Sequence, residues 1–133
     1  MKSLTIFVFI IFLSVSIYFA FSLKKREKIK LNRESAWPEV LDLIISALQS
    51  GASISESLSN LGRVGPNAIK NAFKKFEEDV LSGKKFDDCL TNLKKEFADP
   101  ISDQLFECLY FAAKFGSKNT VKVLRELSEY VSA

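Results

Sequence analysis

The chain opens with a long uncharged stretch and continues as a series of amphipathic segments. Residues 3–23 span 21 positions without a charged side chain. At about 1.5 Å per residue, a helix of this length is roughly 31 Å long, which matches a hydrocarbon core of about 30 Å. The pattern predicts a transmembrane anchor over residues 1–23.

A cleaved signal peptide is the competing interpretation of this stretch. Ala20, Phe21 and Ser22 loosely fit a cleavage site with small residues on both sides. However, the apolar run exceeds the core of about 7–15 residues that a signal peptide has, and only Lys2 provides a charge before it. Dense cations directly after the run also oppose export. The sequence therefore favours the anchor.

After residue 36 the apolar positions recur at helical spacing, and no window alternates with the period of a strand. Glycine and proline separate the periodic segments, which identifies the turns. Six helices are expected: from Pro38 to Gly51, from Ser53 to the closing pair Gly62 and Gly65, from Pro66 to Gly83, over Phe86–Phe97, from Asp99 to Gly116, and over Val121–Val131. Short turns make sequence neighbours pack side by side. The sequence predicts an all-α fold, with a six-helix antiparallel bundle after the transmembrane helix.

Particular residues are expected to begin and end these helices. Ser53 and Glu56 have the S-x-x-E spacing of a capping box. Asp99 is followed by Pro100, as in an N-cap before a proline in the first turn. Glycines at the helix ends are expected to adopt the left-handed conformation of a C-cap. These glycines are Gly51, Gly83 and Gly116.

The stretch SGASISESLSNL (residues 50–61) has an echo in SGKKFDDCLTNL (residues 82–93), and the two align without gaps at an offset of 32. In each, a glycine follows one amphipathic helix and precedes another. A relaxed third copy begins at Gly116. Since a period alone proves little, we interpret the echo as a product of repeated helical hairpins in preference to an ancestral duplication.

The fifth expected helix is apolar nearly all round between Ile101 and Ala112. A helix of this kind lies at the centre of its bundle or in an oligomer interface. The sequence is therefore compatible with a homo-oligomer that forms through this helix.

The composition argues against an enzyme or a metal site. Histidine is absent, which removes imidazole acid–base chemistry and His metal ligands. Cys89 and Cys108 are too few for a zinc site, which needs about four ligands. A disulfide between them stays open, but each occupies an apolar helical position, so buried free thiols are expected. The acidic runs at residues 77–79 and 87–88 have no nucleophile or phosphate loop with them and are interpreted as solvated faces. No catalytic residue, metal or cofactor is predicted.

The net charge of +3 is distributed unevenly. Between Lys24 and Arg33 there are six basic residues and one acidic residue, whereas the chain from Glu34 onward has 12 basic and 15 acidic residues. The folded part therefore lacks the basic excess that nucleic-acid binding requires. We expect a basic juxtamembrane tether over residues 24–36 and a domain over residues 37–133. The cations on the C-terminal side predict that this domain stays in the cytoplasm. They would also attract anionic lipids, through Lys24, Lys25, Arg26, Lys28 and Lys30.

Three stretches, taken in order, resemble the F domain of type II secretion systems. PEVLDLIISALQSGASISESLSNL has an apolar helix that ends in L-x-x-G and then a small-residue turn and an E-[AS]-L helix, at Leu48, Gly51 and residues 56–58. LSGKKFDDCLTNL resembles the family's G-x-x-[FL]-x-x-[AC]-L element at Gly83, Phe86 and residues 89–90. FAAKFGSKNTVKVLRELSEYV resembles its closing helix pair. The resemblance covers about residues 37–131 and is nearest to the TadB-like branch of tight-adherence pili.

This resemblance implies a non-enzymatic platform in the bacterial inner membrane. Its partners would be a cytoplasmic assembly or secretion ATPase, other inner-membrane pilus or secretion components, and pilin subunits. For the ATPase contact we expect exposed charges near the hairpin ends, although such charges also suit a merely solvated face. These residues are Arg63, Lys74, Lys75, Glu78, Lys84 and Lys85.

Two further expectations accompany the resemblance. Members of this branch usually continue through more transmembrane helices, whereas the sequence as printed ends at Ala133. We therefore expect a truncated reading frame, a split protein or a reduced relative. The alternative function is a single-pass membrane adaptor whose helical domain binds another cytoplasmic protein.

Overall fold

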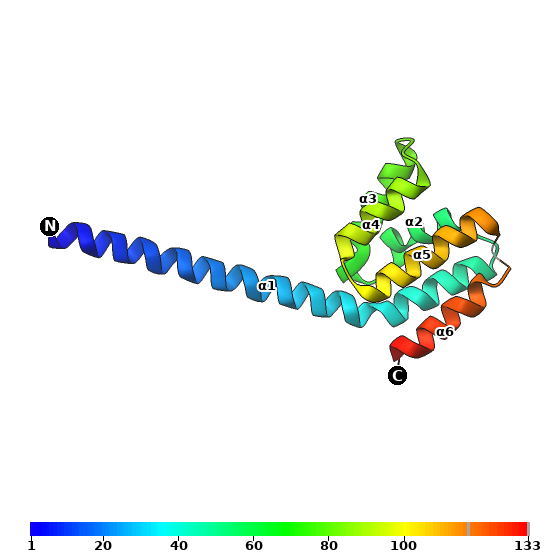
Figure 1. The fold of residues 1–133 in the computed structure, drawn as a ribbon, viewed down its shortest axis with the longest axis horizontal. Helices are drawn as coiled ribbons and strands as arrows, with labels where there is room; N and C mark the ends of the chain where they lie inside the picture. The colour runs from blue at the N-terminus through cyan, green and yellow to red at the C-terminus, as the bar shows by residue number, and fades with distance from the viewer. Residues whose placement is uncertain (117, 133) are drawn as a thin grey trace. The chain divides into compact units, whose positions relative to one another are not determined.

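The computed structural model describes residues 1–116 and 118–132 (Figure 1). Within these ranges every regular element is an α-helix, and the six helices follow one another without a strand. The predicted all-α fold class is confirmed. The chain divides into two compact units, Met1–Asn32 and Arg33–Ala133, which are described one at a time.

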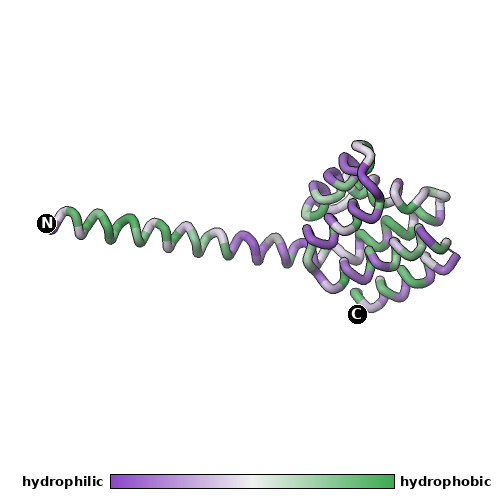
Figure 2. Tube along the Cα trace, turned by 45° about the horizontal axis from the view of Figure 1, so that its top comes forward, coloured by the Kyte–Doolittle hydropathy of each residue, from purple (hydrophilic) through white to green (hydrophobic). Residues whose placement is uncertain are grey.

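The first unit is the amino-terminal part of helix α1 (Lys2–Gln49). Its large apolar side chains between Leu4 and Leu23 are exposed. By length and composition, α1 is the one described helix that is apolar enough to cross a membrane. Figure 2 shows this apolar stretch in green and the cationic residues after it in purple. Lipid would cover side chains that are otherwise exposed to water.

Helix α1 continues without a break through residues 24–36 and ends at Gln49. The helix start predicted at Pro38 is therefore wrong, because Pro38 lies inside α1. Residues 24–34 are mostly Lys, Arg, Glu and Leu, which have high helix propensity and readily extend a helix that has already formed. Pro38 removes one backbone hydrogen bond, but its neighbours Trp37, Val40 and Leu41 are fully buried, which favours the helical path.

The second unit contains the end of α1 and five more helices. These are α2 (Ile54–Val64), α3 (Asn67–Leu81), α4 (Phe86–Phe97), α5 (Pro100–Phe115) and α6 (Thr120–Ser132). Sequence neighbours pack together, with α2 on α3, α3 on α4, α4 on α5, and α5 on α6. Consecutive helices pack together because the connections between them are short, so that each helix folds back against the previous one.

Two of the predicted N-terminal caps are confirmed. The N–H of Glu56 donates to Ser53 Oγ (3.1 Å), and the N–H of Ser53 donates to Glu56 Oε2 (3.2 Å), which completes the capping box of α2. The N–H of Ile101 donates to Asp99 Oδ1 (2.9 Å), and Pro100 is the first residue of α5. Both caps satisfy backbone donors that the helix itself leaves unpaired.

Of the two glycines predicted to close the second helix, Gly65 is confirmed as the C-cap of α2, whereas the prediction for Gly62 is wrong because Gly62 lies inside α2. A Cβ atom at Gly62 would lie 3.0 Å from the backbone nitrogen of Lys74. The missing side chain therefore allows α2 and α3 to approach closely, which is a packing role for a glycine that the sequence pattern identified as a turn.

An aromatic cluster fills one end of the second unit. The ring of Trp37 meets Phe97 edge-on, with centroids 5.0 Å apart, and meets Phe106 at 6.5 Å. Phe73 packs against Phe97 and Phe106 as well. The indole N–H of Trp37 donates to Asp99 Oδ2 (2.9 Å), so the buried cap of α5 also holds α1. We call this region the closed end.

Arg33 packs against the outer side of the closed end. Its guanidinium lies 5.0 Å from the centre of the Phe97 ring. It donates to the backbone oxygens of Ala68 (3.4 Å) and Glu96 (3.2 Å), and it forms an ion pair with the Glu96 carboxylate (3.0 Å). A cation that the sequence grouped with the tether thus belongs to the folded unit.

Helix α5 packs against both α4 and α6 and has two different sides. Leu105, Phe106 and Leu109 are fully buried in the core. Phe111 and Phe115 are instead 57% and 79% exposed. The apolar pattern predicted a helix that is central or in an interface, and α5 has a core side together with an apolar side that no described residue covers.

Candidate partner-binding surfaces

Three glycine turns meet around a groove at the other end of the second unit, which we call the open end. At the first turn, Gly51 has φ +97°, its N–H donates to the oxygen of Leu48 (3.1 Å), and the N–H of Ala52 donates to the oxygen of Ala47 (3.0 Å). These two bonds define a Schellman C-cap, in which glycine tolerates a left-handed conformation that costs other residues energy.

The second turn reproduces the first at an offset of 32. Gly83 has φ +91°, its N–H donates to the oxygen of Val80 (3.1 Å), and the N–H of Lys84 donates to the oxygen of Asp79 (3.1 Å). The serine before each glycine also donates to the residue three before it: Ser50 to Ala47 and Ser82 to Asp79, both at 2.8 Å. The two similar sequence stretches therefore form turns with the same backbone hydrogen bonds.

The third turn has a simpler cap. Gly116 has φ +103°, and its N–H donates to the oxygen of Ala112 (3.0 Å), four residues earlier. The positive φ expected at the glycine turns is thus found at all three positions, although Gly116 combines it with an extended ψ of 155° and does not adopt the left-handed helical conformation. The third copy is relaxed in its hydrogen bonding as well as in its sequence.

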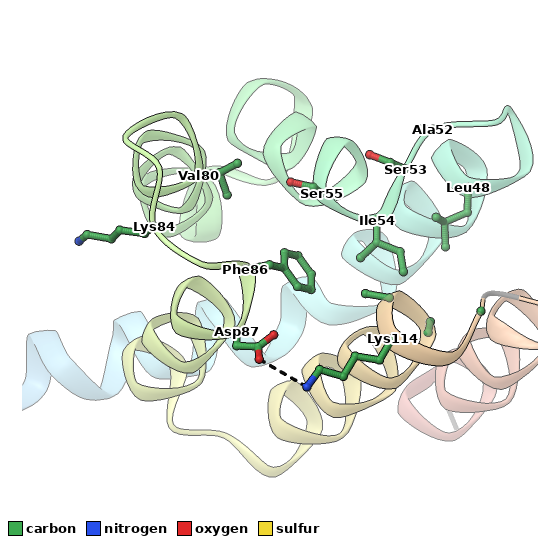
Figure 3. A pocket seen from close by; sticks show the side chains of 13 residues that line it. Leu48, Ala52, Ser53, Ile54, Ser55, Val80, Lys84, Phe86, Asp87 and Lys114 are labelled. Atoms are coloured by element: carbon green, nitrogen blue, oxygen red, sulfur yellow. Dashed lines mark ion pairs between the residues drawn. The ribbon is translucent and has the colours of Figure 1, made fainter.

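The groove between these turns has a volume of about 670 Å³ and is open to solvent. Leu48, Val80 and Ala112 contribute one residue from each turn region, and the first residues of α2 and α4, Ile54 and Phe86, complete the apolar lining. Figure 3 shows Ile54 and the Phe86 ring facing each other across it. A concave apolar surface of this kind suits an apolar side chain of a partner.

Charged side chains form the rim of the groove. Lys114 pairs with Asp87 (3.6 Å), which Figure 3 marks with a dashed line, and its ammonium lies 4.6 Å from the centre of the Tyr110 ring. A hydrogen bond with Tyr110 and the nearby Asp87 carboxylate raise the pKa of Lys114. Lys84 pairs with the largely buried Asp79 (3.1 Å). The rim therefore carries two lysines, Lys84 and Lys114, that are each paired with an aspartate.

The six residues predicted for the ATPase contact are all exposed. Lys74, Lys75 and Glu78 share the outer side of α3, and Lys84 and Lys85 occupy the turn from α3 to α4. The sixth residue, at the end of α2, is Arg63. Arg63 forms an ion pair with Glu77 of α3 (3.7 Å), which draws it toward this side. We call these six residues the α3 charged face. Their role in binding stays a prediction.

The sequence pattern did not predict the groove or the hydrogen bond between Trp37 and Asp99. The groove is built from residues in three turn regions, and the bond joins residues 62 positions apart. Helical periodicity reports which side of each helix is apolar, but not which helix ends meet. The one pattern in the sequence that pointed to the groove was the offset of 32 between residues 50–61 and residues 82–93, because it placed equivalent residues at equivalent turns.

Both cysteines are free thiols, as predicted. Cys89 is fully buried and Cys108 is half-buried. Burial raises the pKa of both thiols, and the Asp79 carboxylate raises that of Cys89 further. Thiols of this kind react slowly. In the part of the chain that the structure describes, no three His, Cys, Asp or Glu side chains gather as a metal site would need.

The geometry defines a class of protein: an all-α domain joined in sequence to a helix that is long and apolar enough to span a membrane. A family model described as "Type II secretion system (T2SS), protein F" matches residues 40–132. The chain therefore belongs to the type II secretion system protein F family, whose members are components of inner-membrane secretion and pilus platforms. No curated protein and no solved structure matches the chain.

Proposed function

We propose that the chain is a non-enzymatic component of an inner-membrane platform for a tight-adherence pilus, in the TadB-like branch of its family. The family match over residues 40–132 carries this proposal. In this role the helical domain binds a cytoplasmic assembly ATPase and passes its nucleotide-driven movement to pilin subunits and other membrane components. The chain itself contributes surfaces and no chemistry.

The proposed topology has a single span and a cytoplasmic domain. Six Lys or Arg residues follow the apolar stretch within residues 24–33, and Lys2 alone precedes it. Such an excess of cations stays on the cytoplasmic side during insertion. The first five of the six, Lys24, Lys25, Arg26, Lys28 and Lys30, are exposed and would lie near anionic headgroups, each with about 1 kcal/mol of attraction.

For the ATPase contact we propose the α3 charged face. Five of its six residues are cationic, and Lys84 also lines the groove of the open end, so charge and an apolar recess lie side by side. An acidic partner surface with an apolar side chain would complement both features. Because the cations are exposed, their contribution to binding should weaken as salt increases.

The test is capture of the ATPase by the full chain. The tagged chain is expressed together with a hexameric tight-adherence assembly ATPase, extracted from membranes in mild detergent and captured at low and at high salt. We expect the ATPase to be retained at low salt and largely lost at about 0.5 M salt, where the Debye length is only a few ångströms. A chain that retains no ATPase at low salt would contradict the proposal.

The second candidate is a single-pass adaptor, and the groove favours it. A recess of about 670 Å³ with an apolar lining suits a short apolar segment of another protein. The same capture separates the two functions, because an adaptor would retain a different protein in place of the ATPase.

A further inference from the structure

The groove of the open end is lined by equivalent residues from the repeated turns. Many of its lining residues lie 32 positions apart in the sequence, in two sets of three and in two pairs: Leu48, Val80 and Ala112; Ala52, Lys84 and Gly116; Ile54 and Phe86; Ser55 and Asp87. The first two copies have the same backbone hydrogen bonds but different side chains. The two sides of the groove can therefore be compared residue by residue.

The two sides differ in size and charge. On the side of the first copy, the lining residues before and after Ile54 are small and uncharged: Ala52, Ser53 and Ser55. On the opposite side, Asp87 and Lys114 form an ion pair (3.6 Å). Figure 3 shows the serines and this ion pair on opposite sides of Ile54 and Phe86. The groove thus has an apolar centre, a charged side, and a neutral side whose small residues let a partner backbone approach closely.

The charged side has the capacity to bind a further anion. Among the described residues that line the groove, Lys84 and Lys114 are the cations and Asp87 is the one acid. The Lys114 side chain is 47% exposed, and its ammonium has three donors, so it can bind a carboxylate in addition to Asp87. The groove is therefore complementary to an apolar segment that has acidic residues along one side.

The backbone around the groove favours a helix over an extended segment. An extended segment docks by pairing with the edge of a sheet, and the described residues form no strand. At the first two turns, the N–H groups of the glycines and of the residues after them already donate within the domain. An extended segment would therefore bury backbone groups without partners, whereas a helix bonds its own.

From these features we infer that the groove binds an amphipathic α-helix of a partner protein. The apolar stripe of this helix lies between Ile54 and Phe86, and its acidic flank faces Lys114. The inference rests on the proposed function, which gives the domain a cytoplasmic protein partner, and it defines the chemistry of the segment that this partner contributes.

The test uses the full chain in nanodiscs of zwitterionic lipid and three fluorescein-labelled peptides of about 15 residues, a length that allows an isolated helix to form. The first has leucine at positions i, i+3, i+4 and i+7 and glutamate along one flank. The second has the same composition with leucine at alternate positions. The third has lysine in place of glutamate. Fluorescence anisotropy measures binding, and empty nanodiscs measure the background from lipid.

We expect the first peptide to bind roughly tenfold more tightly than either of the others, which corresponds to about 1.4 kcal/mol. Equal binding of the alternating peptide would overturn the inference of a helix. Equal or tighter binding of the lysine peptide would overturn the acidic flank. Binding of the first peptide no stronger than to empty nanodiscs would overturn the inference as a whole.

Helix α5 offers a matched pair of positions that locates the binding. Ala113 is exposed and lines the groove, whereas Gln104 is exposed on the same helix and lines a different recess, beside α6. Ala113→Phe should fill the groove and weaken binding of the first peptide by roughly tenfold. Gln104→Phe should leave this binding unchanged. Equal effects of the two substitutions would overturn the assignment to the groove, and both positions are exposed, so the fold tolerates the larger side chain.

Charge reversal tests the orientation of the helix. Lys114→Glu should weaken binding of the glutamate peptide severalfold and strengthen binding of the lysine peptide by a similar factor. Lys122→Glu reverses an exposed charge on α6, outside the groove, and should change neither. If Lys114→Glu does not shift the preference toward the lysine peptide, the acidic flank does not face Lys114 and the proposed orientation is wrong.

The peptides and the ATPase give separate results. A chain that prefers the first peptide but captures no ATPase would contradict the proposed function alone. A chain that captures the ATPase but does not discriminate among the three peptides would contradict the groove inference alone.

Discussion

The closed end and the open end of the helical unit are built from the same helices but differ in what fills them. Trp37 and Leu48 lie about three turns apart on α1, roughly 16 Å along its axis. Aromatic rings and a hydrogen-bonded carboxylate surround Trp37 and bury it completely. Leu48 instead lines a groove that lies between three turns and is open to solvent. One end has the contacts that stabilise a fold, and the other has exposed charges around a concave apolar surface.

The largest expected effect comes from the closed end. Trp37→Ala should lower the free energy of unfolding by about 3–5 kcal/mol, because it removes a fully buried ring and leaves a cavity. Phe86→Ala, at the half-buried lining of the groove, should cost about 1–2 kcal/mol. Urea titration of the full chain in detergent, followed by circular dichroism, measures both. Equal costs would contradict the contrast between the two ends.

The hydrogen bond inside the closed end can be isolated with milder variants. Trp37→Phe keeps an aromatic ring but leaves Asp99 Oδ2 without its indole donor, which should cost about 1–3 kcal/mol. Asp99→Ala removes both the acceptor and the cap of α5. In the double variant the two costs should fall short of additive, because both changes remove the same bond. Strict additivity would show that the bond contributes nothing.

An intermediate effect is expected at the turns of the open end. Gly51→Ala and Gly83→Ala each introduce a Cβ at a positive φ, which should cost about 1–2 kcal/mol although no atom lies within 4 Å of the new carbon. Because the two turns have equivalent hydrogen bonds, the two glycine-to-alanine substitutions should lower the free energy of unfolding by similar amounts. Asparagine at the same positions tolerates the left-handed conformation and should cost less. The same urea titration measures the four variants, and unequal glycine-to-alanine costs would contradict the structural echo.

The smallest expected effect is a dependence on pH. Because the pKa of Cys89 is raised in the folded chain, the folded thiol keeps its proton where the unfolded thiol has lost it. Stability is therefore complete below an unfolded pKa of about 8.5 and declines as the pH rises above that value. Cys108 acts in the same direction.

Urea midpoints at pH 7.5 and pH 9.5 measure this decline. Replacement of both cysteines by alanine should make the midpoint less sensitive to pH over this range. An unchanged sensitivity would show that the thiols do not cause it. Lys114 should contribute little here, because its raised pKa starts from an ordinary value near 10.4.

The parts of the fold that the sequence predicted depend on local patterns. The capping box at Ser53 and Glu56, the cap at Asp99 and the turn at Gly83 each lie within a few residues, where hydrogen bonding is nearly fixed by residue type. The continuity of α1 was missed because a run of charged residues suits a solvated helix and a solvated tether equally well. Length and propensity, not polarity, distinguish the two.

The surfaces could be predicted only in part. Exposure of Lys74 and Lys75 follows from helical periodicity, and the apolar pattern of α5 indicated that apolar residues lie on more than one side of this helix. The groove and the closed end are different, since residues from distant turns and helices meet there. Arg33 illustrates the limit: the same cation serves as a topology signal in sequence and as a clamp on Phe97 and Glu96 in the fold.

The most direct test of the contrast between the two ends uses two exposed lysines at the two ends of α4. Lys85 is at the N-cap of α4 in the α3 charged face, and Lys95 is in the last turn of the same helix, near the closed end. Capture of the assembly ATPase by the full chain at low salt should fall severalfold for Lys85→Glu and stay unchanged for Lys95→Glu. Unchanged capture for Lys85→Glu, or an equal loss for both, would contradict the assignment of ATPase binding to the α3 charged face where it reaches the open end.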